Sequence, residues 1–296
     1  MGALILAGGV GTISALLTKG SPASSSTNGG QTGSPSSSPS PSPQSSAAAQ
    51  AQALYRQVVA ASEQSIGFHY VDVSTQSSPG GAAFTETITG DAGQSQGTQQ
   101  ITLSATPADC GNEQFTLILT SDGTVYFQGN SAALKDQVGV SSASLNGKWI
   151  QVQIGEGPYQ QLEVGITVAS QLQEDTFIPS SVQQVTGSGG VSLTRINGTI
   201  PATQDSPPAA AYFEVTTGST LPVSFVSTVN LDNVTSRMTS TFTKWGTAPS
   251  VSAPASSTGW SALGASPPAS GSYGGGCTSP TAGPSPTPSP GSGGGL

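Results

Sequence analysis

Side chains able to carry out catalysis are scarce in this chain. It contains one histidine, His69 in the stretch FHYVDVS, and no G-x-S-x-G motif that could pair a serine nucleophile with it. Glu174 and Asp175 are adjacent carboxylates near a predicted helix end, and no motif holds two carboxylates at the separation that glycoside hydrolysis needs. SLNGKW lacks the upstream glycine and the following Ser or Thr of a phosphate-binding loop. The sequence therefore predicts a protein that is not an enzyme.

The two cysteines, Cys110 and Cys277, are far apart in the sequence. One histidine and two distant cysteines cannot complete a zinc site without carboxylates, so no metal and no cofactor is expected. A disulfide between Cys110 and Cys277 would tie the end of the chain to the folded part in an oxidising compartment. Two free thiols are the alternative, and the spacing does not decide between them.

Charge is confined to one part of the chain. No charged residue lies between Lys19 and Arg56 or after Lys244, and the stretch from Arg56 to Lys244 carries six basic and fifteen acidic residues. Nucleic-acid binding relies on clustered Lys and Arg that neutralise phosphates, so this acidic balance argues against it. We expect no nucleic-acid partner.

Composition divides the chain into four segments. Residues 1–19 contain the apolar run GALILAGGVGTISALL, which is shorter than the roughly 20 residues that span a bilayer and is typical of a signal peptide or signal anchor whose basic start is missing. Residues 20–46 and 255–296 are Ser-, Pro- and Gly-rich, so we expect a flexible linker and a flexible tail. Residues 47–254 are then one folded domain outside the cytoplasm, attached to the membrane through the apolar segment or secreted.

The stretch QFTLILTSDGTVYFQG, residues 114–129, predicts a β-hairpin. Asp122 and Gly123 favour a tight turn, and the apolar pattern selects a three-residue Ser-Asp-Gly loop with a bulge at Gly123. In that register one face carries five apolar side chains, because a slip by one residue would move all of them to the other face. These are Phe115, Leu117, Leu119, Val125 and Phe127.

The other predicted elements alternate between helices and many short strands. Helices are expected at residues 47–66, 130–139 and 160–174 from their apolar spacing. Strands are expected at residues 68–75, 82–90, 97–105, 148–155, 182–187, 190–201, 211–217, 221–231 and 235–246. Tight turns between neighbouring strands predict an α+β fold, a curled antiparallel sheet with helices packed on its concave face. The enclosed space can be a cavity or a packed core.

Several motifs in the same order resemble the LppX/LprG family of actinobacterial envelope lipoproteins, which share a fold with the carrier LolA. They are ASEQSIGFHYVDVS, SDGTVYFQG, NGKWIQV, LTRINGTIP, LPVSFVSTVNL and TSTFTKWGTAPSVSAP. Together they cover residues 50–254. The chain differs from the family in lacking the cysteine to which a lipid anchor is attached.

The resemblance implies a half-barrel sheet whose helices cover a hydrophobic cavity for the acyl chains of a lipid. The residues implied to line it are Leu54, Val58, Phe68, Phe84, Phe115, Leu117, Leu119, Val125, Phe127 and Trp149. The expected partners are a lipid or other hydrophobic ligand and the cell membrane, and the protein is expected to be a monomer. The alternative is a surface module without a cavity, held on a flexible stalk, that binds a protein or a wall polymer. Small side chains in the strands favour the cavity.

Overall fold

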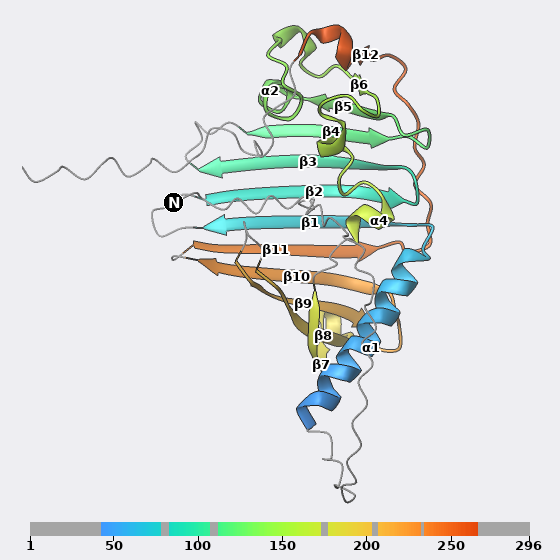
Figure 1. Ribbon diagram of the computed structural model, residues 1–296, viewed down its shortest axis with the longest axis vertical. Helices are drawn as coiled ribbons and strands as arrows, with labels where there is room; N and C mark the ends of the chain where they lie inside the picture. The colour runs from blue at the N-terminus through green and yellow to red at the C-terminus, as the bar shows by residue number, and fades with distance from the viewer. Residues whose placement is uncertain are drawn as a thin grey trace, which may run out of the picture.

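A single twelve-stranded sheet organises the protein. The structure is a computed structural model, and it describes residues 43–77, 83–106, 112–172, 177–202, 207–231 and 234–265. The strands lie in the order β12-β6-β5-β4-β3-β2-β1-β11-β10-β9-β8-β7 (Figure 1). Their bounds are β1 Gly67–Ser77, β2 Ala83–Gly93, β3 Gly97–Thr106, β4 Glu113–Leu119, β5 Val125–Gly129, β6 Ile150–Val152, β7 Ile178–Thr186, β8 Ser192–Ile200, β9 Ala209–Thr216, β10 Pro222–Leu231, β11 Val234–Thr243 and β12 Thr258–Gly259.

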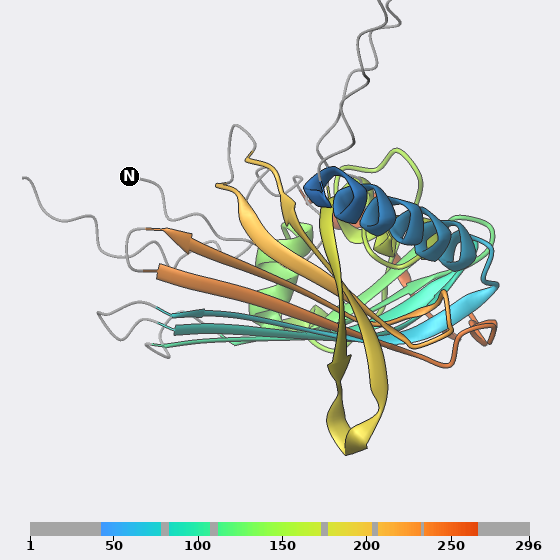
Figure 2. The same ribbon diagram turned by 90° about the horizontal axis from the view of Figure 1, so that it is seen from below.

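The sheet is antiparallel at every pairing except that of β12 with β6, which is parallel. Figure 2 shows that the sheet curls, and that the helices lie on the side toward which it curls. We call this side the inner face. The predicted α+β class, with a curled antiparallel sheet and helices on one side, is confirmed.

Helix α1 (Pro43–Glu63) lies across the inner face near β7 and β8 (Figures 1 and 2). Ala51 and Val58, which lie about two helical turns apart, are buried, and Leu54 and Tyr55 between them are half-buried. This spacing is the apolar stripe of a helix with one face on a core. The Tyr55 ring packs on the rings of Phe177 and Phe213, with centroids 5.0 and 5.5 Å away, so α1 is held by aromatic contacts.

Helix α2 (Ser131–Val138) packs on β4 and β5 at the other end of the sheet. The Asn130 side chain accepts a hydrogen bond from the Ala133 amide, and Gly139 ends the helix in a left-handed conformation. Leu134 and Val138 are fully buried. The prediction of a short helix at 130–139 is confirmed.

The single helix predicted at residues 160–174 is wrong. Two short helices, α3 (Tyr159–Leu162) and α4 (Val168–Gln171), are separated by Gly165 with a φ of 74°. A left-handed residue cannot continue a helix, and the carbonyl groups at the break accept bonds from the sheet instead. Tyr70 Oη donates to the Gly165 carbonyl at 2.9 Å, and Gln99 Nε2 donates to the Val164 carbonyl at 3.4 Å.

Ordered structure extends beyond residue 254, where the tail was expected to begin. The Thr258 amide donates to the Trp149 carbonyl at 2.9 Å, and β12 adds to the sheet beside β6. The helical turn η4 (Trp260–Leu263) follows, and the buried Trp260 indole donates to the Val138 carbonyl at 3.0 Å. These two hydrogen bonds and the pairing of β12 with β6 hold residues 255–265 on the domain. At the other end, α1 begins at Pro43 rather than at residue 47.

Several predictions fall outside the described residues. They concern the apolar segment 1–19, the linker 20–46 up to residue 42, the tail from residue 266, the pairing of Cys110 with Cys277, and the carboxylates of Glu174 and Asp175. Among the described helices none is long and apolar enough to cross a membrane.

Candidate functional site

The middle of the inner face carries polar and small side chains. We call the set Asp72, Ser74, Glu86, Ser227, Met238 and Ser240 the central floor. Strand alternation places its β1 members on the same side as the buried aromatic rings of Phe68 and Tyr70. In register, Ser74 lies opposite Glu86 and Met238, and Asp72 lies opposite Ser240. Met238 in turn lies opposite Ser227.

Asp72 is the most unusual group of the central floor. It is 6 % exposed, and the Gln171 amide of α4 donates to its Oδ2 at 2.6 Å. Its Oδ1 receives no hydrogen bond within the described part of the chain. Burial raises the pKa of Asp72 to about 6, and the Ser240 hydroxyl and the Gln171 amide only partly oppose this rise. The carboxyl can therefore change its charge near neutral pH.

Glu113 shows how this protein satisfies a buried carboxylate elsewhere. The Gln137 amide of α2 donates to Glu113 Oε2 at 2.8 Å, and Gln161 donates to the Gln137 amide oxygen at 3.1 Å. Burial raises the pKa of Glu113 while the bond from Gln137 lowers it. This chain of side chains joins β4, α2 and α3, which gives Glu113 a structural role.

The predicted hairpin register is confirmed. Leu117 lies opposite Phe127 and Leu119 opposite Val125, and Gly123 has a φ of 83° in the loop. The five apolar side chains lie on the inner face and all are buried. The Phe115 and Phe127 rings stack with centroids 5.4 Å apart.

The other residues expected to line a cavity lie in three places. Leu54 and Val58 are on α1, half-buried and buried. Phe68 is buried at the start of β1, where its ring packs on Trp245 with centroids 4.3 Å apart. Phe84 is half-buried on β2, and Trp149 is half-buried before β6. All but Trp149 belong to the apolar core or pack against it.

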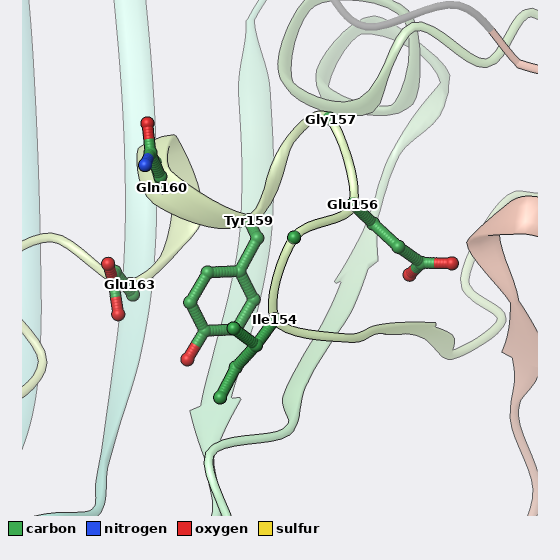
Figure 3. Close-up of a pocket in the computed structure, with 7 residues that line it drawn as sticks. Ile154, Glu156, Gly157, Tyr159, Gln160 and Glu163 are labelled. Atoms are coloured by element: carbon green, nitrogen blue, oxygen red, sulfur yellow. The ribbon is translucent and has the colours of Figure 1, made fainter.

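Two hollows open on the outside of the described structure. The larger, about 540 Å³, is lined by the loop after β6 and by α3, with Tyr159 and Ile154 side by side (Figure 3). The smaller, about 270 Å³, lies along α1 around Tyr55 and Glu63. Neither contains any of the ten residues that were expected to line a cavity.

His69 points away from the central floor, on the outer face of β1. Its Nδ1 lies 2.9 Å from Asp91 Oδ1 on β2. Within the described ranges no group of three His, Cys, Asp or Glu side chains could hold a metal ion. The lone histidine is thus part of a surface pair between neighbouring strands.

Sequence reasoning did not single out the central floor. In FHYVDVS, residues 68–74, every second side chain shares a face, so Phe68 and Tyr70 already place Asp72 and Ser74 inside. An acidic side chain at a core position was therefore a signal present in the sequence. The partners Gln171 and Ser240 had no such signal, because they lie far from Asp72 along the chain.

No protein-family model and no curated protein sequence match this chain. Among solved structures, the chain is similar to lipoprotein LppX of Mycobacterium tuberculosis, with 16% identity over 69% of this chain and 99% of LppX and a TM-score of 0.41. It is similar to LprF of Mycobacterium bovis, with 12% identity over 71% of this chain and 99% of LprF and a TM-score of 0.43. A LolA superfamily protein of Nitrosomonas europaea matches with 9% identity over 65% of this chain and 92% of that protein, with a TM-score of 0.28. The structural matches thus include the family that the sequence motifs resemble, at low sequence identity.

Proposed function

We propose that this protein binds a lipid or another hydrophobic ligand on its inner face and carries it outside the cytoplasm. Binding would be driven by burial of acyl chains, at about 0.8 kcal/mol for each CH₂ group. The apolar segment at residues 2–17 would direct export and could hold the protein at a membrane. The proposal includes no catalytic step.

The observation that carries this proposal is a row of side chains without rings across the inner face. Ser74 of β1, Met238 of β11, Ser227 of β10 and Ala211 of β9 lie opposite one another in register. Phe213 and Phe225 lie beside this row on β9 and β10, and Phe115 and Phe127 lie beyond its β1 end, on β4 and β5 under α2. We infer that these side chains, none of which carries a ring, leave a trough in which an acyl chain can lie across the strands.

The residues implied by the family resemblance fit this proposal in part. Leu54 on α1 and Phe84 on β2 are half-buried apolar side chains, so a bound acyl chain could cover them. The five hairpin residues are packed against one another and against α2. We infer that they form the closed end of the ligand space rather than its lining.

Ligand carriage is tested on the full chain, purified after export from an actinobacterial host. Native mass spectrometry before and after organic extraction is expected to show a bound mass that is released as an acyl lipid. Uptake of a fatty alcohol with a fluorophore at its chain end then measures binding directly. A clean unliganded mass together with no uptake of the probe would contradict the proposal.

A matched pair of variants locates the binding space. Met238→Trp fills the trough from β11, and we expect it to reduce probe uptake at least about tenfold, because a bulky ring occupies the volume of several methylenes. Thr239→Trp places the same ring one residue further, on the outer face, and should leave uptake unchanged. Equal effects of the two variants would move the binding space away from the trough.

The outer face favours a second candidate, a module that binds a hydroxyl-rich wall polymer. Thr85, Thr87 and Thr89 alternate along β2, and Thr239 and Thr241 do so along β11. Their hydroxyl groups form regular rows that could bond to a polysaccharide. Thr241→Lys would disturb such binding without changing probe uptake, and co-sedimentation with purified cell wall would measure it.

A further inference from the structure

The described part of the interior contains buried carboxyl groups and no buried lysine or arginine. Three carboxyl side chains are buried among the described residues, Asp72, Glu86 and Glu113, whereas no described lysine or arginine is buried. A carboxylate removed from water needs a hydrogen-bond donor or a positive charge. Glu113 obtains its donor from Gln137, as described above. Asp72 lies on the central floor, inside the proposed ligand space.

Asp72 is only half satisfied by its own protein. Gln171 occupies Oδ2, and the described residues leave Oδ1 without a hydrogen bond although the side chain is 6 % exposed. Such an atom loses its hydration on folding, which costs free energy, and the Ser240 hydroxyl opposite Asp72 compensates only in part. Structural carboxylates, as at Glu113, avoid this cost. An unsatisfied acceptor that faces the ligand space is therefore explained best by a donor that arrives with the ligand.

We propose that the ligand is an amphiphile whose polar group donates hydrogen bonds, an ammonium or hydroxyl group, and that Asp72 receives this group at the central floor. Ser240 and Ser74, which also lie on the central floor, are the neutral neighbours of this carboxyl. An anionic head group would meet the buried Asp72 carboxylate, beside which none of the described lysine or arginine side chains is buried, and would be rejected. This inference rests on the proposed function, because it assumes that the trough holds the ligand.

Three probes with the same twelve-carbon chain separate head-group recognition from chain burial. Dodecylammonium, dodecanol and dodecanoate each compete with the fluorescent fatty alcohol on the full-length protein at pH 7.5. The wild-type protein is expected to bind dodecylammonium most tightly and dodecanoate most weakly. Asp72→Asn should reduce the preference for dodecylammonium over dodecanoate about tenfold, as expected when one hydrogen bond to a charged group is lost.

Asp91→Asn is the matched control for this test. It makes the same chemical change on the adjacent strand β2, at a half-buried position on the outer face that pairs with His69. We expect it to keep the wild-type order and ratio of affinities. Both variants remove a negative charge from the molecule, so a long-range effect of net charge would appear equally in both.

The possible outcomes separate the head-group assignment from the carrier function. Wild-type protein that binds all three probes equally, or binds dodecanoate best, overturns the head-group assignment and leaves the carrier function standing. The same holds if Asp72→Asn keeps the wild-type ratio. Failure of all probes to bind either protein overturns the carrier function and the head-group assignment with it.

Discussion

The two parts of the inner face handle polar groups in opposite ways. The part of the inner face under α2, which we call the closed region, is apolar. Its Phe115 and Phe127 rings are stacked, and its one buried carboxyl, Glu113, is bonded to Gln137. In the central floor, Asp72 keeps an oxygen without a bond among the described residues. The first region has the complete satisfaction expected of a structural core, and the second has the incomplete satisfaction expected where something else binds. Under the proposed function, stability and binding belong to different strands of one sheet.

Removing a ring from the closed region should have the largest effect on stability. Phe127→Ala deletes a fully buried ring from its stack with Phe115, and we expect a loss of roughly 3–5 kcal/mol in the free energy of unfolding. Urea denaturation measures it. Ile118→Ala, on the outer half-buried side of β4, should cost only about 1 kcal/mol and is the control. A small effect of Phe127→Ala would mean that this region is also open, and the comparison would fail.

The titration of Asp72 on the central floor should make the free energy of unfolding depend on pH. Because the pKa of Asp72 is raised from its ordinary value of 3.8 to about 6, the folded protein holds this proton more tightly than the unfolded chain does. The stabilisation that comes from holding this proton is fully present below pH 3.8 and is lost as the pH rises through about 6. Asp72→Asn cannot titrate, so its stability relative to wild type should rise by about 3 kcal/mol between pH 3.8 and pH 7.

Urea unfolding of both proteins at pH 4, 5, 6 and 7 gives this difference directly. Glu113 and Asp136, whose pKa values are also raised by burial, titrate in both proteins and cancel. Asp91→Asn should follow the wild-type curve. A constant difference between Asp72→Asn and wild type across this range would show that Asp72 is solvated, and the contrast with Glu113 would lose its basis.

The smallest expected effect is that of removing the Asn130 cap of helix α2 in the closed region. Asn130→Ala removes the acceptor for the Ala133 amide and the donor to the Asn112 carbonyl at 2.8 Å. We expect a loss of about 1 kcal/mol in unfolding free energy, as is usual for a helix cap. Ser131→Ala, at the exposed first residue of α2, should change stability by less than about 0.5 kcal/mol. Probe uptake should stay at the wild-type level in both variants, because α2 belongs to the closed region.

Much of the fold could be predicted because residues close together in the sequence determine it. Alternation in QFTLILTSDGTVYFQG defined the buried face of the hairpin, and Asp122 with Gly123 defined its loop. The helix at 130–139 was predictable for the same reason, since a cap and a stop signal lie within one short segment. The break at Gly165 was not, because the partners of the freed carbonyls, Tyr70 and Gln99, belong to strands far away in the chain.

The sequence by itself determined which side chains of each strand face inward, since a period of two depends only on the backbone. It therefore placed Asp72 inside among aromatic residues. Only the tertiary structure decided what that position means. Gln171 reaches Oδ2 from a segment 99 residues away, Ser240 lies across from Asp72 on β11, and none of the described lysine and arginine side chains is buried. Hydrogen bonding and burial depend on such distant neighbours, because the energy of a buried charge is set by everything packed around it and not by its place in the strand.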